Sequence, residues 1–287
     1  MIYLLLSISA STLIFIIFKL FNRYGINTLH AIVINYLTAC LFGMWSYKSP
    51  INIQEILSSQ WIYGAVILGF LFISIFNVMA LTAQRNGLSV ASVASKMSVI
   101  IPIIFGIYVY HEGVGFQKIL GIILALVSVY LTSVKPRGND NVTKGLWLPI
   151  LLFVGSGIID TSIKYVETTY LPEGGIPIFS ATIFTFAFLI GTTLILMKSF
   201  KRGFRLPLKT IFGGSLLGIV NYFSIYYLLK ALNYEGLESS TLFTVNNVAI
   251  VMLSTLLGLF MFKERITKMN WIGIVLAIVS IIIVTFA

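Results

Sequence analysis

The sequence has few charged residues. Only 10% of its 287 residues are charged, whereas 58% are hydrophobic. Soluble domains carry roughly 25% charged residues, so this composition excludes a soluble domain, including one held by a single membrane anchor. It predicts a polytopic membrane protein whose main surroundings are the lipid bilayer.

Residues that build metal, redox and catalytic sites are also scarce. Cys40 is the single cysteine, which excludes an internal disulfide and a cysteine-based metal site, and His30 and His111 lie far apart in the sequence. The chain has no Ser/His/Asp set, no HExxH motif and no phosphate-binding loop that ends in GK[ST]. We therefore expect no catalytic residues, no bound metal, no cofactor and no ATP-driven pumping, and we expect that the protein is not an enzyme.

Apolar segments of membrane-spanning length recur along the chain. A bilayer core of about 30 Å requires roughly 20 apolar residues per helix. Ten segments fit this requirement: 2–18, 29–47, 62–83, 88–110, 115–133, 146–166, 177–197, 210–231, 237–261 and 269–286. The expected fold class is all-α and integral to the membrane, with ten transmembrane helices. No basic residue precedes the first segment, so we interpret it as a span and not as a signal peptide.

The second half of the chain repeats the first. "NGLSVASVASKMSV" at 86–99 aligns with "EGLESSTLFTVNNV" at 235–248, and offsets of 145 to 152 align further identical residues in the same order. The aligned pairs include Ser11 with Ser156, Lys19 with Lys164, Gly64 with Gly213, Gly69 with Gly218, Glu112 with Glu264, and Gly121 with Gly273. We expect a first repeat at 1–133, a linker at 134–145 and a second repeat at 146–287.

The number of helices per repeat sets their relative orientation. Five helices is an odd number, so the two halves must be inserted into the membrane in opposite directions. Inverted repeats of this kind are typical of secondary transporters, whose substrate site lies near the midplane between the halves.

Almost the whole chain resembles the EamA type of the drug/metabolite transporter superfamily. The segments that carry the resemblance are "NGLSVASVASKMSVIIPIIFGIYVYHEG", "ILGIILALVSVYLTS", "EGLESSTLFTVNNVAIVMLSTLLGLFMFKERIT" and "WIGIVLAIVSIIIVTF", together with Lys19 and Lys164 at the ends of two helices. The resemblance implies a ten-helix transporter, in a superfamily that carries amino acids, nucleotide sugars, phosphorylated metabolites and drugs. Lys96 aligns with Val245, which has no charge, so the expected pocket is not symmetric and the resemblance names no substrate.

Basic residues gather in alternate loops. Fourteen of the 19 lie after odd-numbered spans: Lys19, Arg23, Arg85, Lys135, Arg137, Lys144, Lys198, Lys201, Arg202, Arg205, Lys209, Lys263, Arg265 and Lys268. Positive loops stay in the cytoplasm, so we expect these loops to be cytoplasmic. Both termini are then expected on the non-cytoplasmic side of the inner (plasma) membrane. The net charge of +10 then reflects topology and not binding of nucleic acid.

Lys96 is the one charged residue between Leu88 and Tyr110. A charge inside a span costs roughly 2.5–3.5 kcal/mol on insertion scales and is a candidate functional residue. At 1.5 Å per residue, Lys96 lies about 12 Å from Leu88, on a helix face that also carries Ser89 and Ser92. We expect Lys96 to bind an anionic or polar group of a substrate. The alternatives are a lysine that snorkels to the surface or one that pairs with a carboxylate.

Asp160 is the other charge at depth. It lies about 21 Å from the same membrane face, which is about 9 Å deeper than Lys96. A small molecule could bridge the two charges, and this favours a zwitterion such as an amino acid. The alternative is a local ion pair between Asp160 and Lys164, four residues further on.

Pro102 is expected to expose a backbone acceptor in the fourth span. A proline cannot donate to the carbonyl four residues before it, which here is that of Ser98. A carbonyl freed in this way beside a cavity can bind a ligand.

Polar and aromatic side chains in other spans complete the expected cavity. Asn77 lies in the third span, Tyr222 and Tyr226 lie four residues apart in the eighth, and Thr244 and Asn247 share a face of the ninth. Amides in spans also hold helices together, and the sequence leaves both roles open for Asn35 and Asn221. The two tyrosines are expected to offer ring faces to a flat or cationic substrate, and the alternative is that such rings pack or contact lipid. The candidate substrate-binding residues are Lys96, Ser92, Asn77, Asp160, Asn247, Thr244, Tyr222 and Tyr226.

These features predict a membrane transporter of a small polar metabolite, amino-acid-like or another zwitterionic or anionic solute, that works by alternating access. A proton or sodium gradient could drive it, with Asp160 and Glu238 as the available carboxylates, and facilitated diffusion or exchange is equally compatible. The alternative is a non-transporting scaffold or sensor with the same fold. The sequence leaves the oligomeric state open.

Overall fold

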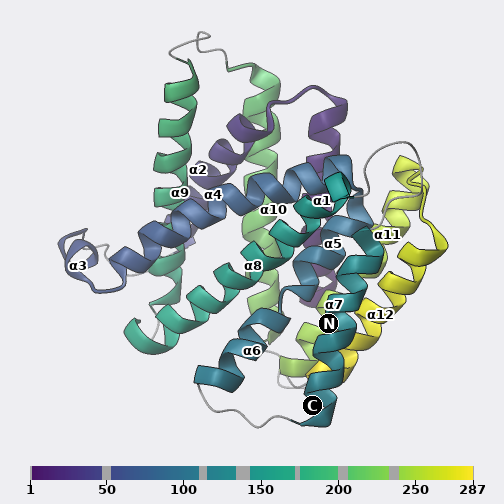
Figure 1. Cartoon of the computed structure of the whole chain (residues 1–287). Helices are drawn as coiled ribbons and strands as arrows, with labels where there is room; N and C mark the ends of the chain where they lie inside the picture. The colour runs from purple at the N-terminus through teal and green to yellow at the C-terminus, as the bar shows by residue number, and fades with distance from the viewer. Residues whose placement is uncertain are drawn as a thin grey trace. The chain divides into compact units, whose positions relative to one another are not determined.

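A computed structural model describes residues 2–46, 53–109, 115–133, 143–171, 175–199, 206–232 and 239–286. The regular structure in these ranges is helical (Figure 1). The helices are α1 (Ile2–Arg23), α2 (Thr28–Ser46), α3 (Ile53–Ser58), α4 (Ile62–Arg85), α5 (Leu88–Met97), α6 (Ile100–Val109), α7 (Phe116–Ser133), α8 (Thr143–Tyr170), α9 (Ile176–Ser199), α10 (Leu208–Leu232), α11 (Ser239–Phe262) and α12 (Lys268–Thr285).

Most of these helices are long and apolar enough to cross a bilayer. Nine such segments occur in the described part of the chain, with the stretch Leu88–Val109 counted as one, and Phe116–Thr132 forms a shorter apolar helix. Each of the ten expected spans therefore falls on a helix of the structure. The chain is a multi-pass membrane protein, as its composition predicts.

The fourth span differs from the expectation because it is two helices. α5 ends at Met97 and α6 begins at Ile100. Pro102 lies in the first turn of α6, where a missing N–H costs a helix least. The carbonyl of Ser98 is not free, because it accepts a hydrogen bond from the N–H of Ile101 at 2.9 Å. The expectation of a freed carbonyl at Ser98 was therefore wrong.

Two further boundaries differ from the sequence-based ones. The short helix α3 lies between the second and third spans, where only a loop was expected. α8 begins at Thr143, inside the expected linker 134–145, and continues to Tyr170. Glu112 and Glu238 lie outside the described residues.

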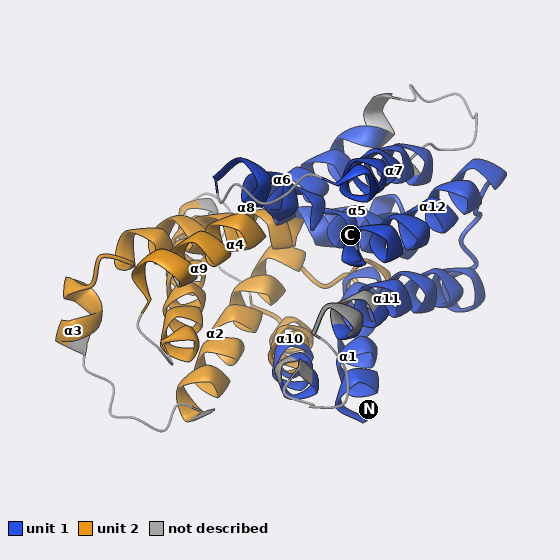
Figure 2. Cartoon of the chain, turned by 90° about the horizontal axis from the view of Figure 1, so that it is seen from below, with its two compact units in different colours: residues 1–20, 78–158, 223–287 blue, residues 21–77, 159–222 orange. Residues whose placement is uncertain are grey.

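The described residues divide into two compact units (Figure 2). Unit 1 contains residues 1–20, 78–158 and 223–287, and unit 2 contains residues 21–77 and 159–222. Each unit therefore draws on both halves of the sequence.

In unit 1, α7 and α12 lie side by side (Figures 1 and 2). Gly121 of α7 packs on Val284 near the end of α12, and Gly273 near the start of α12 packs on Thr132 near the end of α7. Residue numbers thus rise in one helix as they fall in the other, so the helices are antiparallel. The Ser280 hydroxyl donates to the carbonyl of Gly121 at 2.7 Å.

In unit 2, α2 and α9 make the equivalent kind of contact. Gly43 packs on Ala181, and Gly191 packs on Val33. These two helices are also antiparallel, because the contacts join the end of each to the start of the other. The absence of side chains at both glycines lets the two backbones approach closely.

α4 packs through glycines within unit 2. A Cβ added to Gly64 would lie 2.9 Å from Val166 of α8, and one added to Gly69 would lie 2.7 Å from the Cβ of Phe186 in α9. Both distances are too short for a real methyl group, so any larger residue would force the helices apart.

α10 also packs through glycines within unit 2. A Cβ added to Gly213 would lie 3.1 Å from the ring of Phe21, and one added to Gly218 would lie 2.6 Å from the Cβ of Thr38 in α2. The four glycines of α4 and α10 therefore all stand at close helix contacts.

Candidate functional site

The candidate residues predicted from the sequence are distributed over both units. Unit 1 holds Lys96, Ser92, Asn247, Thr244 and Tyr226, and unit 2 holds Asn77, Asp160 and Tyr222. The bridging of Lys96 and Asp160 by a substrate stays a prediction.

Lys96 is half-buried in the last turn of α5. The carbonyls at a helix C-terminus carry partial negative charge, so a cation is favoured there. This local stabilisation was not foreseen, because the fourth span was expected to be continuous. Ser92, one turn earlier, is fully buried, and its hydroxyl donates to the carbonyl of Ser89 at 3.0 Å.

In unit 2, the three candidates have different surroundings. Asn77 is half-buried, and its amide donates to the carbonyl of Ile73 at 2.7 Å. Tyr222 lies with its ring centroid 5.5 Å from that of Phe42. Asp160 is exposed on α8. This bond uses one donor of the Asn77 amide, and its substrate-binding role stays a prediction.

Two amides that the sequence left open form a contact between helices of unit 2. Asn221 of α10 donates to the Oδ1 atom of Asn35 in α2 at 3.3 Å, and both residues are buried. This arrangement is the helix-joining role that polar residues often play in membranes.

In α11, Asn247 is half-buried, and the side chain of Thr244 lies outside the described residues. The neighbouring Asn246 is buried, and its Oδ1 atom lies 3.3 Å from the hydroxyl of Ser7 in α1. The same hydroxyl lies 3.0 Å from the carbonyl of Ser224 in α10. Ser7 and Asn246 thus join three helices of unit 1, and the sequence had not identified Ser7.

Tyr226 faces a cation that belongs to the protein itself. The ammonium of Lys230 lies 4.9 Å from the ring centroid of Tyr226 and 5.2 Å from that of Tyr3. Tyr3 also stacks on Tyr227, with centroids 6.2 Å apart. The ring faces that were expected to attract a cationic substrate therefore hold Lys230 in this conformation.

Glu264, in the connection between α11 and α12, contacts several helices of unit 1. Its Oε1 atom lies 2.9 Å from the ammonium of Lys19 in α1. Both carboxylate oxygens accept from the N–H of Leu88, the first residue of α5, at 3.0 Å. The side chains of Lys19 and Glu264 are 21% and 12% exposed, so the ion pair is largely shielded from solvent. A carboxylate at a helix N-terminus is also stabilised by the helix dipole.

Two glycines make room for this carboxylate. Gly87 precedes α5 with φ 110°, a conformation that favours glycine, and a Cβ there would lie 2.7 Å from Oε2 of Glu264. A Cβ on Gly258 would lie 2.6 Å from the same atom. The N–H of Glu264 donates to the carbonyl of Gly258 at 2.9 Å. We call the group formed by Lys19, Gly87, Leu88, Gly258 and Glu264 the Glu264 clasp.

A backbone turn directs Glu264 into the clasp. Lys263, which follows the last residue of α11, has φ 51°, in the left-handed region that glycine or asparagine usually occupies at a helix end. α12 then begins with a capping box in which Asn270 donates its N–H to the Thr267 hydroxyl at 3.2 Å. The side chain of Asn270 also donates to the carbonyl of Thr132 at 2.9 Å, which joins α12 to α7.

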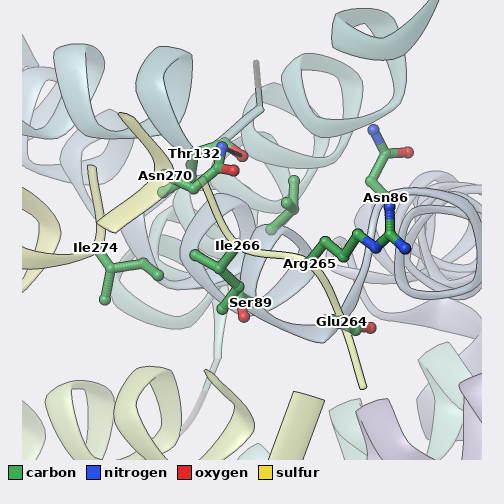
Figure 3. A pocket seen from close by; sticks show the side chains of 9 residues that line it. Asn86, Ser89, Thr132, Glu264, Arg265, Ile266, Asn270 and Ile274 are labelled. Carbon is green, nitrogen blue, oxygen red and sulfur yellow. Dashed lines mark hydrogen bonds between the residues drawn. The ribbon is translucent and has the colours of Figure 1, made fainter. Parts of the chain in front are cut away.

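A small cavity of about 40 Å³ adjoins the clasp (Figure 3). It is lined by Asn86, Ser89, Val90, Thr132, Glu264, Arg265, Ile266, Asn270 and Ile274. One water needs roughly 10–15 Å³ by this measure, so the cavity has room for a few waters and is too small for a metabolite. The Ser89 hydroxyl is buried there and has no hydrogen-bond partner among the described residues.

The sequence marks Lys19 and Glu264 of the clasp but not their contact, and it did not mark Gly87 or Gly258. Glu264 had been aligned with Glu112, and Lys19 with Lys164, as separate features of the repeat. Their sequence positions lie in different halves of the chain, and no local pattern predicts that two such residues meet. The one available signal was that each charge recurs at the end of a span in both halves.

The chain has a distant homologue of nearly the same length. It is 28% identical over 284 residues to an "Uncharacterized protein" of Haemophilus influenzae, and the alignment covers 97% of this chain and 95% of that protein. No family profile matches the chain. The homology therefore covers the full set of spans and assigns no activity.

Proposed function

We propose that the protein is a transporter of the EamA type that moves a small polar metabolite by alternating access between two inverted five-helix repeats. The observation that carries this proposal is the reciprocal pairing of helix contacts. If two repeats are related by a two-fold axis, a contact between residue a of the first and residue b′ of the second requires a contact between a′ and b.

The α7–α12 contact in unit 1 follows this rule. An offset of 152 residues takes Gly121 to Gly273 and Thr132 to Val284. The contact of Gly121 with Val284 then corresponds to that of Gly273 with Thr132, and both are present.

The α2–α9 contact in unit 2 follows it independently. An offset of 148 residues takes Gly43 to Gly191 and Val33 to Ala181. Gly43 packs on Ala181, and Gly191 packs on Val33. In both pairs the partner helices are antiparallel, which supports an axis in the membrane plane and hence inverted repeats.

The glycines of α4 and α10 add two more reciprocal contacts in unit 2. Under similar offsets, the contact of Gly69 with Phe186 corresponds to that of Gly218 with Thr38. The contact of Gly64 with Val166 corresponds in the same way to that of Gly213 with Phe21. Random sequence matches would not also match in their packing partners.

The proposed substrate is an amino-acid-like or other zwitterionic or anionic solute. Lys96 binds its anionic group, and Asp160 holds an amine at the other end. The second repeat offers Val245 in place of Lys96, so the proposed site has one lysine and no symmetry-related cation.

The test uses purified protein in liposomes with a library of metabolites. A substrate should raise the melting temperature of the protein and should also be taken up by the liposomes. Lys96→Met should leave the protein folded, because it removes a costly charge from the membrane, and should abolish uptake. Lys209→Met is the matched control, because Lys209 is exposed and its ammonium bonds only the carbonyl of Tyr24 among the contacts described here, at 3.1 Å.

A structural role for Lys96 has a different signature. If Lys96 pairs with Asp160, Lys96→Met alone should destabilise the protein, and the double variant with Asp160→Asn should restore stability. A folded and fully active Lys96→Met protein would show that the lysine only snorkels. Absence of any metabolite that both stabilises the protein and is taken up would contradict the proposed function.

A further inference from the structure

The Glu264 clasp joins the ends of several spans at one face of the membrane. Lys19 lies in the last turns of α1, Leu88 begins α5, and Glu264 follows the end of α11. The Gln84 amide also donates to the carbonyl of Phe18 at 2.9 Å, which ties the end of α4 to α1 nearby. The connections that meet here follow odd-numbered spans, so the distribution of basic residues predicts that this face is cytoplasmic.

The clasp differs from an ordinary surface ion pair. Exposed pairs contribute little because water competes with each partner. Here the Glu264 carboxylate bonds the ammonium of Lys19 and the N–H of Leu88, and it also packs against two glycines of the clasp. All of these contacts depend on the position of a single side chain, so displacement of Glu264 would break the polar contacts that tie α1 and the start of α5 to the connection after α11.

The cavity behind Glu264 indicates where the released groups would be solvated. A buried hydroxyl without a partner is rare in native proteins and requires a reason. The Ser89 hydroxyl has none within the part of the chain that the structure describes. Ser89 lies beside the carboxylate, since a Cβ on Gly258 would lie 2.6 Å from Oε2 and 3.6 Å from the Ser89 Oγ atom. Water that enters this space can hydrogen-bond the hydroxyl and hydrate the carboxylate when it leaves Lys19.

We propose that the Glu264 clasp is the closed position of a cytoplasmic gate in the transport cycle. This inference rests on the proposed function. Closure is the state in which Glu264 bonds Lys19 and the N–H of Leu88. Opening breaks both contacts, and water then fills the cavity at Ser89.

The test measures access to the cavity from each side of the membrane. Cys40→Ala removes the single native cysteine, and Ser89→Cys then places a reporter thiol in the cavity. A charged, impermeant methanethiosulfonate reagent is applied to inside-out vesicles and to intact cells. Adding Lys19→Met should raise the labelling rate in inside-out vesicles by about tenfold or more, since hydrogen bonds to charged groups change an equilibrium by that order. Lys209→Met is the matched control and should leave the rate unchanged.

A second reporter and a charge swap make the result decisive. Val90 lines the same cavity. The variant Val90→Cys therefore serves as the reporter if Ser89→Cys does not fold. Exchanging the two charges, Lys19→Glu with Glu264→Lys, should not restore slow labelling, because it places a cation at the N-terminus of α5. Restoration by the swap would overturn the gate, because it would reduce the clasp to a simple ion pair.

Two other outcomes would overturn the proposal. One is a labelling rate that Lys19→Met leaves unchanged in folded protein, even if its melting temperature falls, because the clasp would then be a structural contact. The other is labelling from the outside of intact cells only. Labelling needs no substrate, so failure of the gate is distinguishable from failure of the proposed function, which is the absence of uptake by the wild-type protein.

Discussion

Both units have close glycine contacts between helices, but they differ in one further contact. Unit 2 contains a ring cluster around the fully buried Tyr36, whose ring centroid lies 5.7 Å from that of Phe76 and 5.9 Å from that of Phe184. Unit 1 contains the Glu264 clasp, in which one carboxylate joins a lysine and a helix N-terminus. Ring packing and close glycine contacts are lost only when helices separate, whereas a polar contact can be exchanged with water one bond at a time. Movement is therefore expected first at the helix ends of unit 1.

The largest effect is expected in unit 2, at Gly69. Gly69→Val would place side-chain atoms against the Cβ of Phe186 and the backbone N of Ala187, which an added Cβ would approach to 2.7 Å and 3.0 Å. Neither atom can rotate away, so we expect a loss of about 3 kcal/mol in the free energy of unfolding, at the upper end of overpacking effects. Denaturant unfolding in detergent measures it. Gly115→Val is the control, because nothing lies within 4 Å of a Cβ there, and equal losses in both variants would contradict close packing at Gly69.

The next effect is expected at the clasp of unit 1. Glu264→Gln should lower the free energy of unfolding by about 2 kcal/mol, and Lys19→Met by about 1 kcal/mol, because only Glu264 also caps α5. The double variant should lose less than the sum, with a coupling of about 1 kcal/mol. Strictly additive losses would show that the two charges do not interact, and unit 1 would then resemble unit 2.

A smaller effect in unit 1 is expected at the start of α12. Thr267→Ala removes the hydroxyl that accepts from the N–H of Asn270, and loss of such a cap costs about 1 kcal/mol. Thr267→Ser keeps the hydroxyl and should retain most of the stability in the same unfolding measurement. If Thr267→Ala is as stable as wild type, the capping box does not position the connection that carries Glu264.

The smallest effect is expected at Tyr36 in unit 2. Tyr36→Phe removes the hydroxyl that donates to the carbonyl of Phe72 at 2.9 Å and keeps the ring. Hydrogen bonds between helices in membranes contribute about 0.6 kcal/mol on average, so the melting temperature should fall only slightly. A loss larger than that of Glu264→Gln would reverse the comparison, since polar contacts would then dominate unit 2 as well.

Much of the fold could be predicted because membrane insertion depends on local properties of the chain. A span needs a certain length of apolar residues, and that length can be read in one window of sequence. The predicted segments match the helices for this reason. The break between α5 and α6 was missed because Pro102 was treated as a perturbation within one helix, whereas the chain ends one helix and begins another around it.

The candidate site could be predicted only in part. Charge within a span marks Lys96 from the sequence alone, because few other residue types are so costly there. The partners of Glu264 and the contact between Asn35 and Asn221 could not be predicted, since hydrogen-bonding capacity says nothing about which distant group will meet it. The accommodation of the carboxylate by Gly87 and Gly258 likewise depends on atoms far apart in the sequence.

The sequence by itself determined that the chain is a multi-pass membrane protein and where its spans lie, because the hydrophobic length of a span is a property of a short segment. It also predicted which residues of the two halves correspond. Only the tertiary structure decided which recurring residues touch: Gly121 with Val284, Gly273 with Thr132, and Lys19 with Glu264. The physical reason is that packing and ion pairing act over a few ångströms, and only the folded chain brings groups from different halves of the sequence within that range.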